Sequence, residues 1–147
     1  VQRYHERHRE QLPELIRLSR RVEMVHAGKP GCPSGLADVL ENLMQELDSH
    51  MRKEERVLFP MLAQGQREQA DAPILVMRME QDHHGEALEA IMDVTGKLTL
   101  PEDACNTWRA LYAGLQEFKE DLMDHIHLEN NVLFQNPSLA RQGAIHG

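Results

Sequence analysis

The chain has 147 residues, which is enough for one domain with a substantial hydrophobic core. Its 24 acidic residues outnumber its 16 lysines and arginines, and the formal net charge of −8 argues against a nucleic-acid partner, because no basic surface can neutralise phosphates. No apolar run approaches the roughly 18–20 residues of a membrane span, and no signal peptide opens the chain, so we expect a cytoplasmic protein without membrane partners. The first residue is Val1, which leaves open whether the sequence is a fragment of a longer protein.

Four helices are predicted, and strand-like alternation is absent. The first helix runs from about the start of the chain to Val25, where the Gly- and Pro-rich segment 28–33 breaks it. Ser34 is expected to cap the second helix, which continues to around Ala63. Pro60 lies near the end of this helix and is expected to kink its last turn.

The third helix is expected to begin near Pro73, after a longer polar link, and to end around Gly96. The fourth follows Pro101-Glu102-Asp103, with proline at a favoured first-turn position, and runs to about Phe134. This organisation predicts an all-α fold, an up-down-up-down four-helix bundle, in one domain that spans residues 1–147.

A repeated His-x-x-x-Glu pattern carries most of the functional information. His50 and Glu54 lie four residues apart in the second helix, and His125 and Glu129 repeat this spacing in the fourth. Residues four apart share one face of a helix, so each pair can reach one metal ion or two neighbouring ions. Two such helices that face each other would assemble a carboxylate-bridged dinuclear metal site.

Both pairs continue the apolar seam of their helix. Three-and-four spacing predicts burial in the second helix of Leu36, Leu40, Leu43, Leu47, His50, Glu54, Val57 and Met61. In the fourth helix it predicts burial of Ala104, Trp108, Leu111, Leu115, Phe118, Leu122, His125, Glu129 and Leu133. An unpartnered carboxylate on a buried seam is very costly, and a metal cluster neutralises it directly.

The first helix is expected to add one imidazole to this site. Counting depth from the connecting loops places His5 and His8 near the level of His50. His5 is favoured as the ligand because it shares a seam with Leu12 and Leu15, whereas His8 falls on the flank of that seam. The alternative ligand His8 stays open at this point.

The third helix is harder to interpret. Its seam reads Met77, Gln81, His84, Leu88, Ile91 and Thr95, and His83 points to its flank. We predict His84 as a metal ligand, although a buried histidine without metal is a competing interpretation. Gln81 is a poor ligand for iron, but its amide can hydrogen-bond to a bound water or to a bridging carboxylate. Glu46 and Glu80 are either orienting partners of ligand histidines or solvated helix acids.

The remaining histidines and the two cysteines receive structural interpretations. His26 is expected at a helix end far from His5, and His127 is expected to point away from the seam. Cys32 and Cys105 form no CxxC pair, so we interpret both as free thiols of a reducing compartment.

Residues 4–15, 49–55 and 124–134 resemble the hemerythrin-like (HHE) domain of the RIC / YtfE / ScdA iron–sulfur cluster repair family, and the resemblance covers essentially the whole chain. It implies a non-haem di-iron centre, with or without an oxo or hydroxo bridge, in which both glutamates bridge the two irons. The ligands implied by this resemblance are His5, His50, Glu54, His125 and Glu129.

Two features depart from that family's pattern. The family has a Glu-His-Asp run on the third helix whose histidine is a ligand, and residues 80–82 here read Glu-Gln-Asp. Either His84 substitutes for the histidine expected at Gln81, or one of the two metal positions is weakened or empty, or this is a variant chain in which glutamine has replaced histidine. The family's N-terminal domain, with its adjacent cysteine pair, is absent from this sequence.

The resemblance implies a stress-response protein that takes part in the repair of damaged iron–sulfur clusters. Damaged iron–sulfur proteins and the small ligands NO and O2 are the expected partners, and iron donation and redox turnover are both open, so enzymatic activity is undecided. The alternative is a hemerythrin-type module that binds, senses or stores oxygen or iron without turnover. Manganese or zinc in place of iron, and the oligomeric state, a homo-oligomer included, also stay open.

Overall fold

The computed structural model describes residues 2–133, which form helices joined by loops and turns. In chain order the elements are α1 (Gln2–Val25), α2 (Leu36–Lys53), the π-helix η1 (Glu54–Leu58), α3 (Phe59–Ala63), α4 (Asp71–Val94), α5 (Asn106–Leu128) and the π-helix η2 (Glu129–Leu133). Because α2, η1 and α3 follow one another without a break, and η2 continues α5, the elements make four long helical segments.

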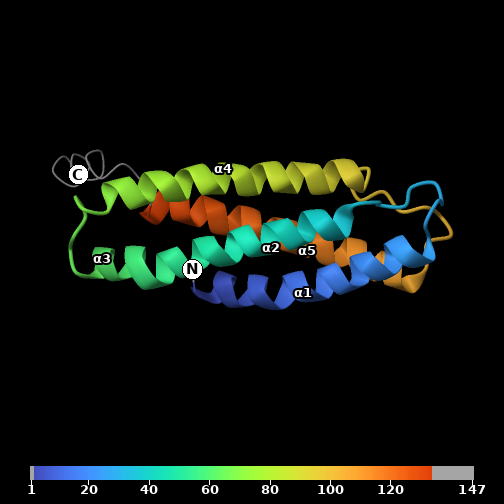
Figure 1. Cartoon of the computed structure of the whole chain (residues 1–147), viewed down its shortest axis with the longest axis horizontal. Helices are drawn as coiled ribbons and strands as arrows, with labels where there is room; N and C mark the ends of the chain where they lie inside the picture. The colour runs from blue at the N-terminus through green and yellow to red at the C-terminus, as the bar shows by residue number, and fades with distance from the viewer. Residues whose placement is uncertain (1, 134–147) are drawn as a thin grey trace.

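These four segments lie side by side in an elongated bundle (Figure 1). α1 packs against α2 and α5, α2 packs against α4, and α4 packs against α5. The chain reverses at loops 26–35 and 95–105 at one end of the bundle and at link 64–70 at the other (Figure 1). The predicted all-α up-down-up-down bundle is therefore confirmed. No helix within residues 2–133 is long and apolar enough to cross a membrane.

The predicted seams form most of the core. The buried apolar side chains that share one cluster include Leu12, Leu15, Val22, Leu36, Leu40, Leu43, Leu47, Leu88, Ile91, Trp108, Leu111, Leu115, Phe118 and Leu122. Full burial of each leucine contributes about 1.5–3 kcal/mol relative to an exposed side chain. This cluster holds the four segments in register, and the polar residues described below lie on the same seams.

The start of α2 differs from the prediction that Ser34 is its N-cap. Gly35 is the N-cap, with φ +90, and the carboxylate of Glu23 on α1 replaces a local cap. Glu23 accepts hydrogen bonds from the backbone N–H of Gly35 at 2.6 Å and of Ala37 at 3.0 Å. A negative charge at a helix N-terminus satisfies free donors and complements the helix dipole, so a long-range contact performs the role assigned to Ser34.

The starts of the last two long helices also differ from the prediction. α4 begins at Asp71, ahead of Pro73, and ends at Val94. Pro101 does not lie in the first turn of α5, because α5 begins only after Cys105. Pro101 lies instead in a preceding turn, where its carbonyl accepts a hydrogen bond from the N–H of Ala104. The predicted end of this helix at Phe134 lies outside the described residues.

The π-helix η1 explains why the predicted burial of Val57 is wrong. Val57 is 50% exposed, whereas Leu58 is 1% exposed and packs with Ala70, Ile74 and Met77. A π turn contains more residues than an α turn, so the buried face moves on by one position after Glu54. The helix therefore changes from α to π geometry at Glu54, ahead of the kink predicted at Pro60. The side chain of Leu133, predicted to be buried, lies outside the description.

Gly114 on α5 allows α1 to approach closely, which gives a test of this packing. A Cβ at this position would lie 2.8 Å from Leu15 Cδ2, whereas a Cβ at Gly85 on α4 would meet nothing within 4 Å. We expect Gly114→Val to lower the free energy of unfolding by about 1–3 kcal/mol, since overpacking forces the core to shift. Gly85→Val is the matched control and should change it by less than about 0.5 kcal/mol. Urea unfolding followed by circular dichroism measures both, and equal losses would contradict the assigned close contact.

Candidate metal centre

A cluster of histidines and glutamates lies on the inner face of three segments. His5 comes from α1, Glu54 begins η1, His125 lies in the last turn of α5 and Glu129 begins η2. One ligand atom from each of these four buried residues lies within 4.8 Å of the others. Two imidazoles and two carboxylates at this separation can hold one metal ion.

His50 on α2 joins this cluster through both carboxylates. Its Nε2 lies 3.0 Å from Oε1 of Glu54 and 3.8 Å from Oε1 of Glu129. Nε2 of His5 lies 3.4 Å from Glu54, and Nε2 of His125 lies 3.3 Å from Glu129. The structure therefore brings together five of the six residues that the sequence predicted as ligands.

Most of the inward-facing atoms of these five residues lack hydrogen-bond partners within residues 2–133, the exception being Oε1 of Glu129. Within residues 2–133, buried side-chain atoms without a partner include Nε2 of His5, His50 and His125, both carboxylate oxygens of Glu54, and Oε2 of Glu129. Leaving so many buried polar atoms unsatisfied would cost roughly 1–3 kcal/mol each. A cation surrounded by these atoms removes this cost, so the residues fit a metal centre.

The protonation states also suit metal binding. Burial, helped by the neighbouring His8 and His5, lowers the pKa of His125 to about 2, so this imidazole is neutral and has a free lone pair. Burial acts to raise the pKa of Glu54, but contacts with His5 and His50 outweigh it and leave the pKa below its usual value. A neutral imidazole and an ionised carboxylate are the forms that coordinate metals.

A side chain of the protein lies close to the other ring nitrogen of each of the three histidines. Nδ1 of His5 lies 2.8 Å from Glu55, whose carboxylate accepts two 3.0 Å hydrogen bonds from Arg9. Nδ1 of His50 lies 3.4 Å from Glu80 but forms no hydrogen bond within residues 2–133, and Glu80 pairs with Lys53 at 3.0 Å. Such contacts fix the ring orientation of metal-binding histidines. The contact of Glu80 agrees with the orienting alternative that we considered for it.

His8 supports the third histidine, a role that the sequence analysis missed. It is buried, and its Nε2 lies 3.1 Å from Nδ1 of His125. Burial lowers the pKa of His8 to about 4, so it is neutral and can accept a hydrogen bond at Nε2 while Nδ1 faces Gln11 at 3.3 Å. Gln11 in turn donates to Asp121 at 2.8 Å. The spacing of His5 and His8, three residues apart on α1, places both on one helix face, but it does not identify His125 as the partner of His8.

Gln81 contacts the cluster from α4. It is 4% exposed, and its Nε2 donates a 2.8 Å hydrogen bond to Oε1 of Glu129, as we considered for a bridging carboxylate. Its Oε1 has no partner among residues 2–133. Gln81 therefore lies beside a carboxylate of the centre, at the position where the resemblance led us to expect a histidine.

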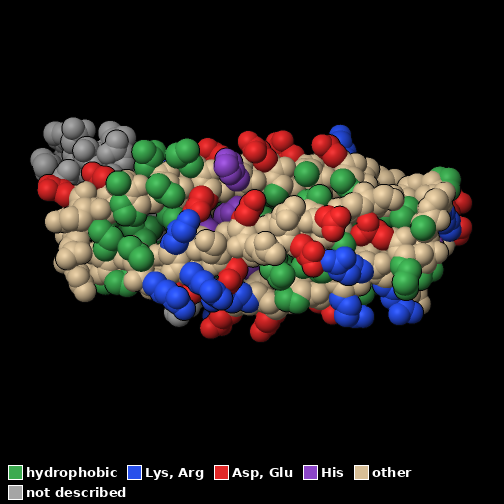
Figure 2. All heavy atoms as spheres, in the orientation of Figure 1, with side chains coloured by type: hydrophobic (Ala, Val, Ile, Leu, Met, Phe, Trp, Pro, Cys, Tyr) green, Lys and Arg blue, Asp and Glu red, His purple; other side chains and the backbone are tan. Residues whose placement is uncertain are grey.

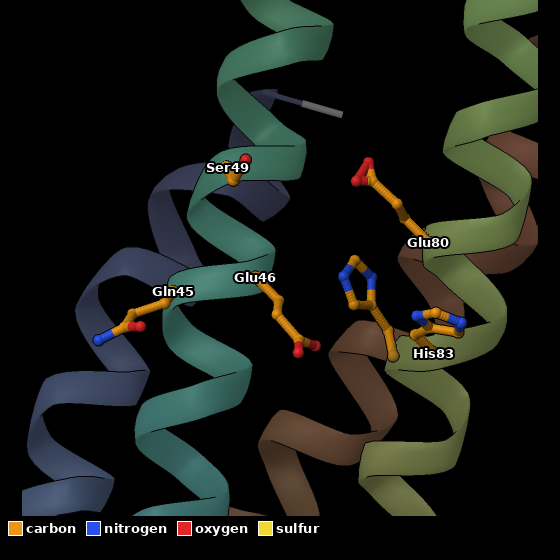
Figure 3. Close-up of a pocket in the computed structure, with 6 residues that line it drawn as sticks. Gln45, Glu46, Ser49, Glu80 and His83 are labelled. Atoms are coloured by element: carbon orange, nitrogen blue, oxygen red, sulfur yellow. The ribbon is translucent and has the colours of Figure 1, made fainter.

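His84 lies one turn further along α4 and outside the group of four. It is 2% exposed, and its ring meets the ring of His50 edge-on at a centroid distance of 5.0 Å. Burial lowers its pKa to about 3. It lines a cavity of about 360 Å³ with Glu46, Glu80 and His83, whose side chains border the space between α2 and α4 (Figure 3). Its role as a ligand stays a prediction.

His127 and His26, which the sequence placed outside the site, lie away from the cluster. His127 is exposed, as expected for a side chain that points away from the seam. His26 follows the last residue of α1, at the loop end of the bundle. On the face shown in Figure 2, histidine side chains reach the surface between α2 and α4, with acidic side chains around them.

Both π-helices begin at a glutamate of the centre. η1 starts at Glu54 and η2 at Glu129, each four residues after its histidine. Single π turns inside α-helices occur frequently at functional sites, where they redirect side chains. The sequence contained a signal for this feature, because both pairs are followed by the same exit, Val-Leu-Phe, at 57–59 and 132–134.

Comparison with known proteins shows what this chain is similar to. The Hemerythrin HHE cation binding domain matches residues 1–136. The "Iron-sulfur cluster repair protein YtfE" of Yersinia pseudotuberculosis serotype IB (strain PB1/+) is 56% identical over 134 residues, which is 91% of this chain and 61% of that protein. The protein of the same name from Yersinia pestis (strain Pestoides F) is 55% identical over the same shares. The chain thus spans 61% of the length of these curated relatives.

Replacing Glu55 tests how the centre is supported. Glu55→Ala removes the partner of His5 Nδ1 without removing an inward-facing ligand atom. We expect the affinity for a divalent cation to fall by about tenfold or more, as is typical for partners of metal-binding histidines. Competition with a chromophoric chelator measures this affinity.

Glu14→Ala is the matched control, because Glu14 is an exposed acid on the same helix whose one ion pair within residues 2–133 is with Arg17 of its own helix. It should leave the affinity unchanged. Equal affinities for the two variants would show that Glu55 does not support His5 as a ligand.

Proposed function

This chain belongs to the Hemerythrin HHE cation binding domain family, and on that basis we propose that it is a non-haem di-iron protein that serves in the repair of iron–sulfur clusters damaged by nitrosative or oxidative stress. The observation that carries most of the proposal is the buried cluster of five side chains whose inward-facing atoms, apart from Oε1 of Glu129, have no hydrogen-bond partner within residues 2–133. The name of the relatives, which are iron–sulfur cluster repair proteins, supports the choice of substrate.

The residues suit one complete and one incomplete metal position. His5, Glu54, His125 and Glu129 supply four ligand atoms for a first ion. The same two carboxylates and His50 supply three for a second ion, and Gln81 is the neighbour on the fourth side. Glutamates shared between two ions are the usual bridges in helical-bundle di-iron proteins.

Gln81 makes the second position the weaker one. Its carboxamide is a poorer ligand than imidazole, and its N–H group is already engaged with Glu129. An ion held by three good ligands leaves more readily than one held by four. Iron at imidazole and carboxylate ligands supplies reversible one-electron chemistry and an open coordination position for NO or O2. The asymmetric ligand set favours donation of iron, as the cargo of the reaction, over repeated redox turnover.

Restoring the missing histidine tests the proposed asymmetry. After passage over a desalting column with a mild chelator, we expect about one iron per chain in the wild type and about two in Gln81→His, since the variant completes the second ligand set. His84→Ala decides between the two alternatives for the second position, because it leaves the iron content of the wild type unchanged if His84 only packs against His50. If His84→Ala instead lowers the iron content of the otherwise wild-type chain, then His84 is the fourth ligand. Well under one metal per chain in protein purified without chelators would contradict the di-iron proposal.

Transfer of labelled iron tests the proposed function. We expect the chain loaded with ⁵⁷Fe to restore the cluster of an iron–sulfur enzyme that has lost one iron, with ⁵⁷Fe appearing in the cluster by Mössbauer spectroscopy. Gln81→His should transfer more slowly, since it retains its second ion, and His127→Gln, an exposed change, should match the wild type. A reversible O2 or NO adduct without any iron transfer would favour the alternative, a binding or storage module.

A further inference from the structure

A second pair of reactive groups lies at the loop end of the bundle. His26 follows the last residue of α1, and Cys105 precedes the first residue of α5. Nε2 of His26 lies 3.2 Å from Sγ of Cys105. A base within hydrogen-bond reach of a thiol is the arrangement that activates cysteine nucleophiles. The pair is roughly 30 Å along α1 from His5, so it is separate from the metal centre.

Packing holds His26 in this position. Its ring lies 4.9 Å from the ring of Trp108, which is fully buried, and its backbone N–H donates to the carbonyl of Val22. The ion pair between Lys29 and Asp103, at 2.7 Å, joins the two loops that carry the pair. The contact between imidazole and thiol is therefore built into the fold.

Cys105 lies at the N-terminus of α5, beside the free N–H groups of its first turn. Cys105 is the N-cap of this 23-residue helix, and its side chain makes no capping hydrogen bond. The free N–H groups of a first helical turn and the helix dipole stabilise negative charge at this point. Cysteines at helix N-termini next to a cationic or basic residue are those that react as nucleophiles.

A cavity gives small molecules access to the pair. It has a volume of about 230 Å³ and is lined by Arg21, Val22, Val25, His26, Cys105 and Thr107. Cys105 is half-buried, so its sulfur is reachable and still shielded in part from bulk water. Arg21 adds a cationic residue to the lining of the cavity.

We propose that Cys105 is a peroxide-reactive thiol and that His26 is its base. As the sulfur attacks one oxygen of hydrogen peroxide, the thiol proton passes to Nε2 of His26 and the O–O bond breaks. The departing hydroxide takes up this proton and leaves as water, and the sulfur, oxidised by two electrons, becomes the sulfenic acid. The reaction needs one peroxide per thiol and no other reactant.

The chain offers Cys32 as an internal control. It is also a half-buried free thiol, in the loop before α2. Within residues 2–133, no hydrogen bond joins it to a histidine, and it does not lie at the N-cap of a long helix. Trypsin places Cys32 in peptide 22–52 and Cys105 in peptide 98–109, so mass spectrometry follows both thiols in one sample.

Competitive labelling tests the proposal on the purified chain with its metal bound. Limiting iodoacetamide should modify Cys105 at least about tenfold faster than Cys32, as expected for a thiol assisted by a base. Hydrogen peroxide with dimedone as the sulfenic-acid trap should label Cys105 first. His26→Gln should remove both preferences and leave the labelling rate of Cys32 unchanged.

His127→Gln is the matched histidine control, since His127 is exposed and distant from both thiols, and it should behave as the wild type. Circular dichroism checks that His26→Gln keeps its helical content. Equal rates for the two cysteines in the wild type, or a preference for Cys105 that persists in a folded His26→Gln, would overturn the proposal.

Discussion

The contact between buried carboxylates and the inward-facing nitrogens of three histidines is the constraint on which the rest of this structure depends. Glu54 and Glu129 are 0% and 1% exposed, and each lies within 3.0–3.8 Å of imidazole nitrogens that lack another partner in the described part of the chain. An uncompensated buried carboxylate costs several kcal/mol. The bundle tolerates two of them because a cation can bind between them.

The surroundings of the centre follow from this requirement. Metal-binding geometry is precise, so each histidine needs a fixed ring, and Glu55, Glu80 and His8 each contact the outer nitrogen of one of them. Two of these three supports, Glu55 and Glu80, are carboxylates that are partly exposed at the surface. The third is His8, which is buried and neutral.

Two groups of side chains with different candidate roles lie at different points along the bundle. The cluster of five metal-binding candidates occupies the half of the bundle that contains the start of α1, η1 and η2, whereas the histidine–thiol pair occupies the end where loops 26–35 and 95–105 meet. The apolar core between them excludes water and keeps the four segments in register. The length of the helices therefore keeps the two groups of side chains out of contact.

Much of this arrangement was present in the sequence, because spacing along a helix determines which residues share a face. The repeated His-x-x-x-Glu pattern identified four residues of the centre, and loop-depth counting added His5. The tertiary structure decided what spacing cannot encode. The N-terminus of α2 is capped by Glu23 from another helix, the π turn at Glu54 exchanges Val57 for Leu58 in the core, and His8 turns toward His125. Each of these depends on a contact between segments distant in the chain or on a local change in helical pitch, and neither can be read from a regular helical period.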